Sequence, residues 1–262
     1  MTNTKRKPIN IATLVKIRED LYVPLDFKEN HAYFAKPDGT GAYHGVTSIL
    51  RVIAKPALIG WAANMVVEHI KANWSDVDVM EKGFAWFEPI LEEARTAHTK
   101  KKEKAGELGS DVHSLIETLV KSVIGVWGGI IDPNTKSENA QVQKFIDWAV
   151  ENQVKFIESE KQVFSKESWY AGTLDLVLEM KGEKYIADVK TSSGIYPEMY
   201  LQMAAYQGAL EEMNEHLDIK GAMVINLDKK GGFEIGMNYA YDDNRIAFLA
   251  ALVLYKQLEA LK

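Results

Sequence analysis

The sequence contains no cysteine among its 262 residues. Disulfide bonds are therefore excluded, and so are zinc sites and iron–sulfur clusters held by cysteine thiolates. No apolar run reaches the roughly 20 residues of a membrane-spanning helix. The basic residues near the N-terminus are not followed by the apolar stretch of a secretory signal. From these absences we expect a cytoplasmic protein without a membrane-embedded part.

A surplus of positive charge is also missing. The chain has 31 Lys and Arg against 37 Asp and Glu, a net charge of −6. A negative net charge does not favour nucleic acid as a partner. It is still compatible with one, because a metal site concentrates acidic residues, and what matters then is whether lysines form a local basic group. One basic group comprises Lys5, Arg6 and Lys7. A second comprises Lys100, Lys101, Lys102 and Lys104. Each group is either a nucleic-acid contact or a solvated surface.

The chain has no GxxxxGK[S/T] phosphate loop, so it carries no helicase motor of that kind. Internal repeats and low-complexity linkers are absent as well. The composition that remains is that of an ordinary globular protein, with 47% hydrophobic and 26% charged residues. A chain of this length forms one large domain or two small ones.

The first 105 residues are predicted to be mainly helical after a hairpin centred on Asp38-Gly39. We expect one helix from Pro56 to about Lys71 and another from Pro89 to about Ala105, because proline suits the first turn of a helix. Residues 74–88 are predicted to be irregular. Their aromatic side chains either pack in the core or stack on unpaired bases; they are Trp74, Phe84, Trp86 and Phe87.

Strands and helices alternate in the second half of the chain. The periodicities and turn residues predict helices over 110–122, 138–157 and 243–261, a helix that begins at Pro197, and strands over 160–166, 173–180, 185–190, 223–227 and 233–239.

The strands over 173–180 and 185–190 form the segment with the clearest chemistry. A tight turn at Lys181-Gly182 would place Asp175 opposite Asp188, with Lys190 on the same face. Like charges opposed across a sheet destabilise it. A divalent cation beside the lysine would offset the repulsion, and carboxylate oxygens suit Mg²⁺ or Mn²⁺. The alternative is an exposed strand face with a solvated pair of acids.

Four short motifs surround this hairpin in a particular order. They are Gly-Ser-Asp-Val-His at 109–113, Gly-Thr-Leu-Asp at 172–175, Asp-Val-Lys-Thr-Ser at 188–192 and Gln-Met-Ala-Ala-Tyr at 202–206. Together they resemble the PD-(D/E)xK nuclease superfamily, and more narrowly its RecB-like branch, which includes phage exonucleases. The motifs span somewhat over a third of the chain. The second acid here is aspartate, where many members of the superfamily have glutamate.

The resemblance implies an α/β (α+β) fold with a restriction-endonuclease-like core, in which helices flank a central mixed sheet. Within a single nuclease domain over residues 1–262, it implies a mainly helical N-terminal elaboration over 1–105 and a catalytic core over 106–262.

The resemblance also implies a set of metal ligands. Asp175 and Asp188 would bind one or two Mg²⁺ or Mn²⁺ ions directly, together with the backbone carbonyl of Val189 and the side chain of His113. Lys190 would position or activate the attacking water and stabilise developing charge. A lone helical histidine such as His113 is otherwise more often structural. The cysteine-held iron–sulfur cluster of some relatives is excluded.

Four further residues are implied at or near the site. Gln202 and Tyr206, four apart on one helix face, would lie beside the catalytic groups and orient them or the nucleic acid. Glu117 and Glu160 are candidate additional metal ligands. The alternatives are that Glu117 only orients His113 or pairs with a lysine, and that Glu160 is a plain surface residue.

The function implied is a metal-dependent DNA exonuclease that acts on single- or double-stranded ends in recombination, repair or end processing, in bacterial or phage-infected cells. A recombinase, a single-strand-binding protein or a helicase would be its partner, and a homo-oligomer is compatible with the resemblance. The alternatives are a structure- or site-specific endonuclease and a non-catalytic DNA-binding module of the same fold.

Overall fold

The computed structural model describes residues 26–28, 32–34, 42–213 and 217–261. The Asp38-Gly39 turn and the N-terminal basic group lie outside them. The chain forms two compact units. One comprises Met1–Val52 and Glu117–Lys262, and the other comprises Ile53–Ile116. The expected division between residues 105 and 106 falls inside a continuous helix, α4 (Phe84–Trp127).

The first unit is built on a mixed sheet. Its strands are β1 (Asp26–Lys28), β2 (Ala32–Phe34), β3 (Ala42–Gly45), β4 (Lys155–Ser165), β5 (Tyr170–Met180), β6 (Glu183–Lys190), β7 (Ile219–Leu227) and β8 (Phe233–Asn238). β5 pairs antiparallel with β4 and with β6, β6 runs parallel to β7, and β7 pairs antiparallel with β8. β3 runs parallel to the start of β5 and continues antiparallel through β2 to β1. The prediction of an α/β protein with a mixed sheet is confirmed.

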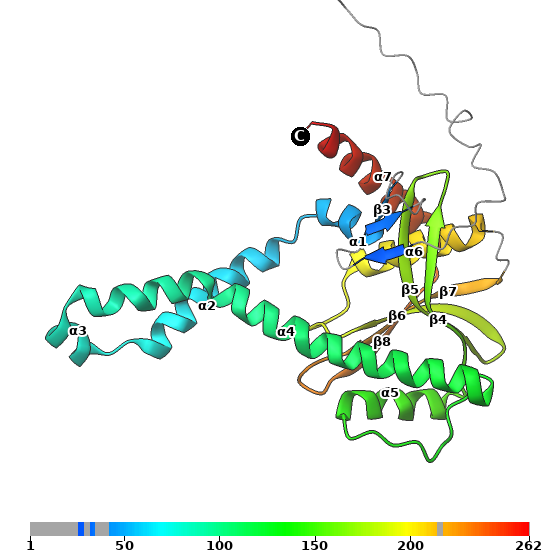
Figure 1. Cartoon of the computed structure of the whole chain (residues 1–262), viewed down its shortest axis with the longest axis horizontal. Coiled ribbons are helices and arrows are strands. Elements are labelled where there is room, and N and C mark those ends of the chain that lie inside the picture. Colours follow the sequence, from blue (N-terminus) through cyan, green and yellow to red (C-terminus); the bar gives the residue numbers. More distant parts are fainter. Residues whose placement is uncertain (1–25, 29–31, 35–41, 214–216, 262) are drawn as a thin grey trace, which may run out of the picture. The chain divides into compact units, whose positions relative to one another are not determined.

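Helices cover this sheet. α6 (Pro197–Glu212) connects the parallel strands β6 and β7, and it packs on β4, β5, β6 and β7 (Figure 1). α7 (Tyr241–Ala260) and the short α1 (Val46–Ile49), which a 3-10 turn at Leu50–Val52 follows, pack beside α6. Asn139 caps α5 (Ala140–Glu151), because its side chain accepts hydrogen bonds from the backbone N–H groups of Gln141 and Val142. The predicted start of α6 at Pro197 is confirmed.

The predicted hairpin of β5 and β6 is confirmed together with its register. Lys181 and Gly182 both have positive φ angles, 56° and 78°, as the two central residues of a type I′ turn do. The ladder then runs from Met180 opposite Glu183 to Leu176 opposite Ala187. The local turn chemistry therefore sets the register that brings the two aspartates to adjacent positions.

The helix predicted over 138–157 ends six residues earlier than expected, at Glu151. Gln153, two residues later, has a φ of 52°, a left-handed conformation that a helix does not continue through. Phe156 consequently belongs to β4, where its ring stacks on Phe145 of α5 at 5.6 Å between centroids. Tertiary packing on the strand overrides the helical spacing of these aromatic residues.

The helices predicted over 89–105 and 110–122 are one helix, α4, of 44 residues. Pro89 is the sixth residue of α4, so its missing N–H removes one hydrogen bond early in the helix without ending it. The glycines at 106 and 109 weaken a helix without ending it. Residues 74–88 were expected to be irregular, but they include α3 (Asp76–Lys82), which the Ser75 side chain caps by accepting from the Asp78 N–H at 3.2 Å.

The second unit consists of α2 (Pro56–Asn73), α3 and the Phe84–Ile116 part of α4. The start of α2 at Pro56 matches the prediction. Trp74 and Phe84 contact the ring of Phe87 at 5.0 and 6.2 Å between centroids, yet they are 47% and 69% exposed. The predicted core packing of these aromatics is therefore only partial. The lysines of the second basic group are exposed on α4; they are Lys100, Lys101, Lys102 and Lys104.

Among the described residues, no single helix is long and apolar enough to cross a membrane, although two consecutive helical segments joined by a bend pass the same criterion together.

Gly172 generates a stability prediction. A Cβ at this position of β5 would lie 2.4 Å from Cε1 of the buried Tyr206 ring, which belongs to α6. We expect Gly172→Ala to destabilise the protein by about 1–3 kcal/mol, the usual cost of overpacking, as measured by urea unfolding. Gly125→Ala is the matched control. Its Cβ would meet nothing within 4 Å on α4, so it should leave stability equal or slightly higher. Equal stabilities for the two variants would contradict the expectation.

Candidate active site

Three acidic residues occupy equivalent positions on neighbouring strands. The β4–β5 ladder pairs Ser159 with Leu176 and Lys161 with Leu174, which sets Glu160 opposite Asp175. The β5–β6 register sets Asp188 on the other side of Asp175. Because directly opposed residues share a face of the sheet, the three carboxylates form a row. The row is called the acid row below and comprises Glu160, Asp175 and Asp188.

The sheet opens at Asp175. The β5–β6 ladder stops at Leu176, and β3 pairs only with Tyr170 and Ala171 along the same edge of β5. From Gly172 to Asp175, between these two ladders, this edge of β5 forms no ladder with another strand among the described residues. Asp175 Oδ2 instead accepts a hydrogen bond from the Val189 N–H at 2.9 Å. The N–H and C=O of a strand residue point to the same neighbour, so the Val189 carbonyl is also directed toward the Asp175 side.

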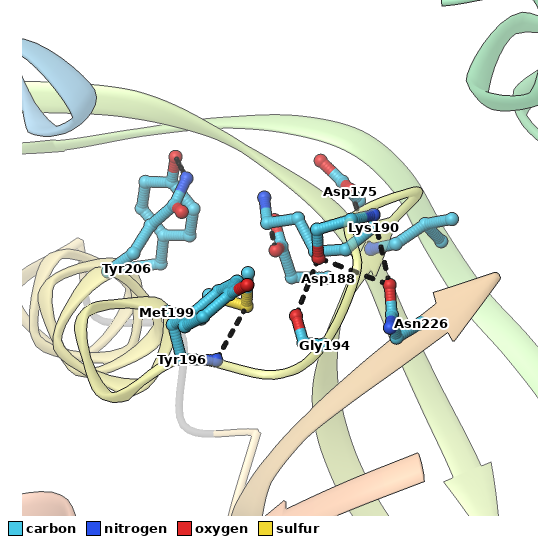
Figure 2. A network of polar contacts seen from close by, with 11 residues as sticks. Asp175, Asp188, Lys190, Gly194, Tyr196, Met199, Tyr206 and Asn226 are labelled. Atoms are coloured by element: carbon cyan, nitrogen blue, oxygen red, sulfur yellow. Dashed lines mark hydrogen bonds and ion pairs between the residues drawn. The ribbon is translucent and has the colours of Figure 1, made fainter. Parts of the chain in front are cut away.

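Asp188 and Lys190 form an ion pair next to Asp175 (Figure 2). The Asp188 side chain is only 1% exposed, and that of Lys190 is 25% exposed. Burial alone would lower the pKa of Lys190, but the charges of Asp188 and Asp175 outweigh it and raise the pKa above its ordinary value. Lys190 therefore stays protonated at neutral pH. It can stabilise negative charge and orient a water, but it is a poor general base.

Glu160 has an unusual backbone conformation and a raised pKa. Its φ of 52° lies in the left-handed region, which is rare for a residue other than glycine and costs of order 1–3 kcal/mol. Burial, followed by the charges of Asp175, Glu117 and Asp188, raises its pKa to about 7, against the opposing effect of Lys121. The carboxylates of the acid row thus repel one another in a partly buried place, an arrangement that a bound cation would relieve.

Glu117 lies on the C-terminal part of α4, within the first unit. Its carboxylate pairs with Lys121 at 2.5 Å, one turn further along the helix, which agrees with the expectation that it pairs with a lysine. Its charge nevertheless acts on Glu160. His113 lies one turn before Glu117 on the same face of α4, among the residues of the second unit.

Gln202 and Tyr206 are joined on α6, where Gln202 Nε2 donates to Tyr206 Oη at 2.7 Å. The Tyr206 ring lies against Gly172. Gly172 and Asp175 are three residues apart on β5, so they face opposite sides of the sheet. The pair is therefore on the other side of β5 from Asp175, where it supports the strand that carries the aspartate.

Asn226 is a residue that the sequence analysis missed. It is 2% exposed and lies beside Lys190 in the β6–β7 register. Its Oδ1 accepts the Ser192 N–H at 3.1 Å, while the Ser192 hydroxyl donates to the Gly194 carbonyl at 2.7 Å (Figure 2). These bonds fix the loop that leaves Lys190. The signal available was a single polar residue inside the apolar run Met223–Leu227.

Comparisons with known proteins add little to this geometry. No family model matches the sequence, and no curated protein matches it. A solved structure titled "Crystal structure of SSO0001" is similar with a TM-score of 0.36 and 12% sequence identity, over 78% of this chain and 87% of that chain.

The raised pKa of Glu160 generates a pH prediction. Without metal, the folded state holds this proton more tightly than the unfolded state, so stability falls as the pH rises from about 4.5, the ordinary value, to about 7. Glu160→Gln should therefore be more stable than the original protein at pH 8, by on the order of 1–2 kcal/mol after allowance for solvent screening. The difference should vanish below pH 4.5.

Urea unfolding in EDTA across pH 4–8 measures this difference. Glu167→Gln, which changes an exposed carboxyl group, is the control and should show no such trend. If Glu160→Gln changed the stability by the same amount at pH 4 and at pH 8, the packing of the side chain rather than its charge would determine the difference.

Proposed function

We propose that the protein is a metal-dependent DNA exonuclease that hydrolyses phosphodiester bonds. The observation that carries the proposal is the acid row with Lys190 joined to its last member. Three carboxylates on adjacent strands would repel one another without a cation, and oxygen ligands suit Mg²⁺ or Mn²⁺. The motif order in the sequence supports the narrower assignment to a RecB-like nuclease.

The donor set fits one or two divalent cations. Asp175 and Asp188 would hold the metal, with the Val189 carbonyl and Glu160 as additional oxygen ligands. We include His113 on the strength of the Gly-Ser-Asp-Val-His motif in the sequence. The metal supplies a more acidic bound water and a polarised phosphoryl oxygen.

Lys190 has the clearest role among the protein groups. Its raised pKa keeps it cationic, so it would stabilise the charge that develops on the phosphate oxygens and orient the attacking water. Asn226 would act indirectly, because it fixes the loop at Ser192, two residues after Lys190. Gln202 and Tyr206 would maintain the position of β5 from the other side of the sheet.

Two other functions remain as alternatives. A structure- or site-specific endonuclease would use the same metal site. A DNA-binding module without catalysis would need no lysine beside the acids, and Lys190 is present and paired with Asp188. A recombinase, a single-strand-binding protein or a helicase in a bacterial or phage-infected cell would be a partner for the exonuclease, and a homo-oligomer is compatible with it.

Cleavage of end-labelled DNA tests the proposal. The purified protein is incubated with linear duplex, single-stranded and covalently closed circular DNA in Mg²⁺, Mn²⁺ or EDTA. We expect linear DNA to be degraded only with metal and circles to be spared. Lys190→Ala should reduce the rate at least 100-fold because it removes charge stabilisation at the reacting phosphate. Asp188→Asn should reduce it as much because it removes a ligand of the metal.

Lys184→Ala is the matched control, since Lys184 lies on the same strand, β6, at its other end. It should retain the original rate. Cutting of circles would favour the endonuclease. DNA binding without cleavage would favour the binding module, and full activity of Lys190→Ala would exclude this site.

A further inference from the structure

Lys121 is a lysine beside the acid row that the catalytic assignments leave unused. It lies in the part of α4 that belongs to the first unit, and its side chain is 51% exposed. Its ammonium group pairs with Glu117 at 2.5 Å, and its positive charge acts on Glu160. The side chain is thus near the acid row and accessible to a large ligand.

The net charge around the acid row shows why a second lysine, in addition to Lys190, matters for binding DNA. Glu160, Lys190 and the described groups whose charges act on them include four acids and two lysines; they are Glu117, Glu160, Asp175, Asp188, Lys121 and Lys190. With every group ionised, their net charge is −2. Without metal, an anionic DNA strand would approach this surface against repulsion. One divalent cation would bring the net charge to zero, so a lysine that can turn to a phosphate adds an attraction that neutralisation alone does not supply.

The two lysines differ in how they can respond to a phosphate. Lys190 is three-quarters buried and paired with Asp188, which is itself buried, so displacing it would leave an uncompensated buried charge. The Lys121–Glu117 pair is exposed, and exposed ion pairs are worth about 0–1 kcal/mol. Exchanging Glu117 for a phosphate oxygen therefore costs little and yields a charge-assisted contact.

We propose that Lys121 is a substrate-binding residue that contacts a backbone phosphate of the DNA strand held at the acid row, with Glu117 as its partner in the free protein. This inference rests on the proposed nuclease function. No covalent step is involved, because Lys121 exchanges one anionic partner for another. The contact is to the backbone, so it is independent of sequence.

Binding of a fluorescently labelled 20-nucleotide DNA tests the inference. Anisotropy is measured in Mg²⁺ between 50 and 200 mM salt, in the Lys190→Ala background so that the strand stays intact. Lys121→Ala should weaken binding by roughly fivefold at low salt and reduce the slope of log affinity against log salt by about 1. Lys121→Arg should retain the slope, and Glu117→Gln should tighten binding because it releases the lysine.

The control is Lys136→Ala, which removes an exposed lysine from a loop of the first unit. It should leave the slope unchanged. In cleavage assays with Lys190 present, Lys121→Ala should raise KM and keep kcat within about twofold of the original value. This is the pattern expected when a contact that is equally strong in the bound substrate and in the transition state is lost. Thermal unfolding checks that the variants fold.

The outcomes separate the two proposals. If the original protein cleaves DNA but Lys121→Ala has the same salt slope of binding as Lys136→Ala, the inference about Lys121 is overturned and the proposed nuclease function is kept. A loss of affinity that Lys121→Arg does not restore means that the lysine acts through packing, which also overturns it. Absence of both DNA binding and cleavage in the original protein overturns both proposals.

Discussion

Mutual repulsion among carboxylates is the constraint on which the rest of this structure depends. Glu160, Asp175 and Asp188 occupy one row across three strands, and burial adds to the cost of their charges. Such a row persists only where the surrounding fold over-determines it. The protein contributes Lys190, which neutralises Asp188, and the Val189 N–H, which donates to Asp175. The remaining repulsion, together with burial, raises the pKa of Glu160, and the proposed cation would relieve it.

The sheet is adapted to this row in a specific way. β5 pairs with β4 on both sides of Asp175, between Tyr170 and Glu179, but leaves β6 at Leu176, so that Asp175 lies where two strands diverge. β6 nevertheless continues to Lys190, because β7 pairs with it in parallel and Asn226 holds the following loop at Ser192. On the other side of β5, Gly172 allows the Tyr206 ring to lie directly on the strand backbone. The acids are therefore held by rigid strands rather than by loops.

A feature of this fold was predictable from the sequence where a few neighbouring residues determine it, and not where distant parts of the chain do. The register of β5 and β6 follows from two residues, Lys181 and Gly182, whose turn type leaves one pairing. The end of α5 was predicted wrongly because the left-handed Gln153 and the packing of Phe156 decide it. α4 was predicted as two helices, although the glycines at 106 and 109 weaken a helix without ending it. The side of β5 on which Tyr206 lies was also not predictable. A motif spacing on a helix does not specify which face of a sheet the helix covers.

Glu160 shows why a candidate site is harder to predict than a fold. In the sequence it is one acid in a polar strand, and a surface position was the ordinary expectation. Its role depends on pairing with a strand ten residues away, on a left-handed backbone, and on a helix more than thirty residues earlier in the chain. The strand and the helix are non-local, and the left-handed backbone and the neighbouring carboxylates cost stability in the metal-free protein. Since natural proteins accept such costs mainly at functional sites, the destabilising features at Glu160 are themselves an argument that the acid row functions in binding a cation.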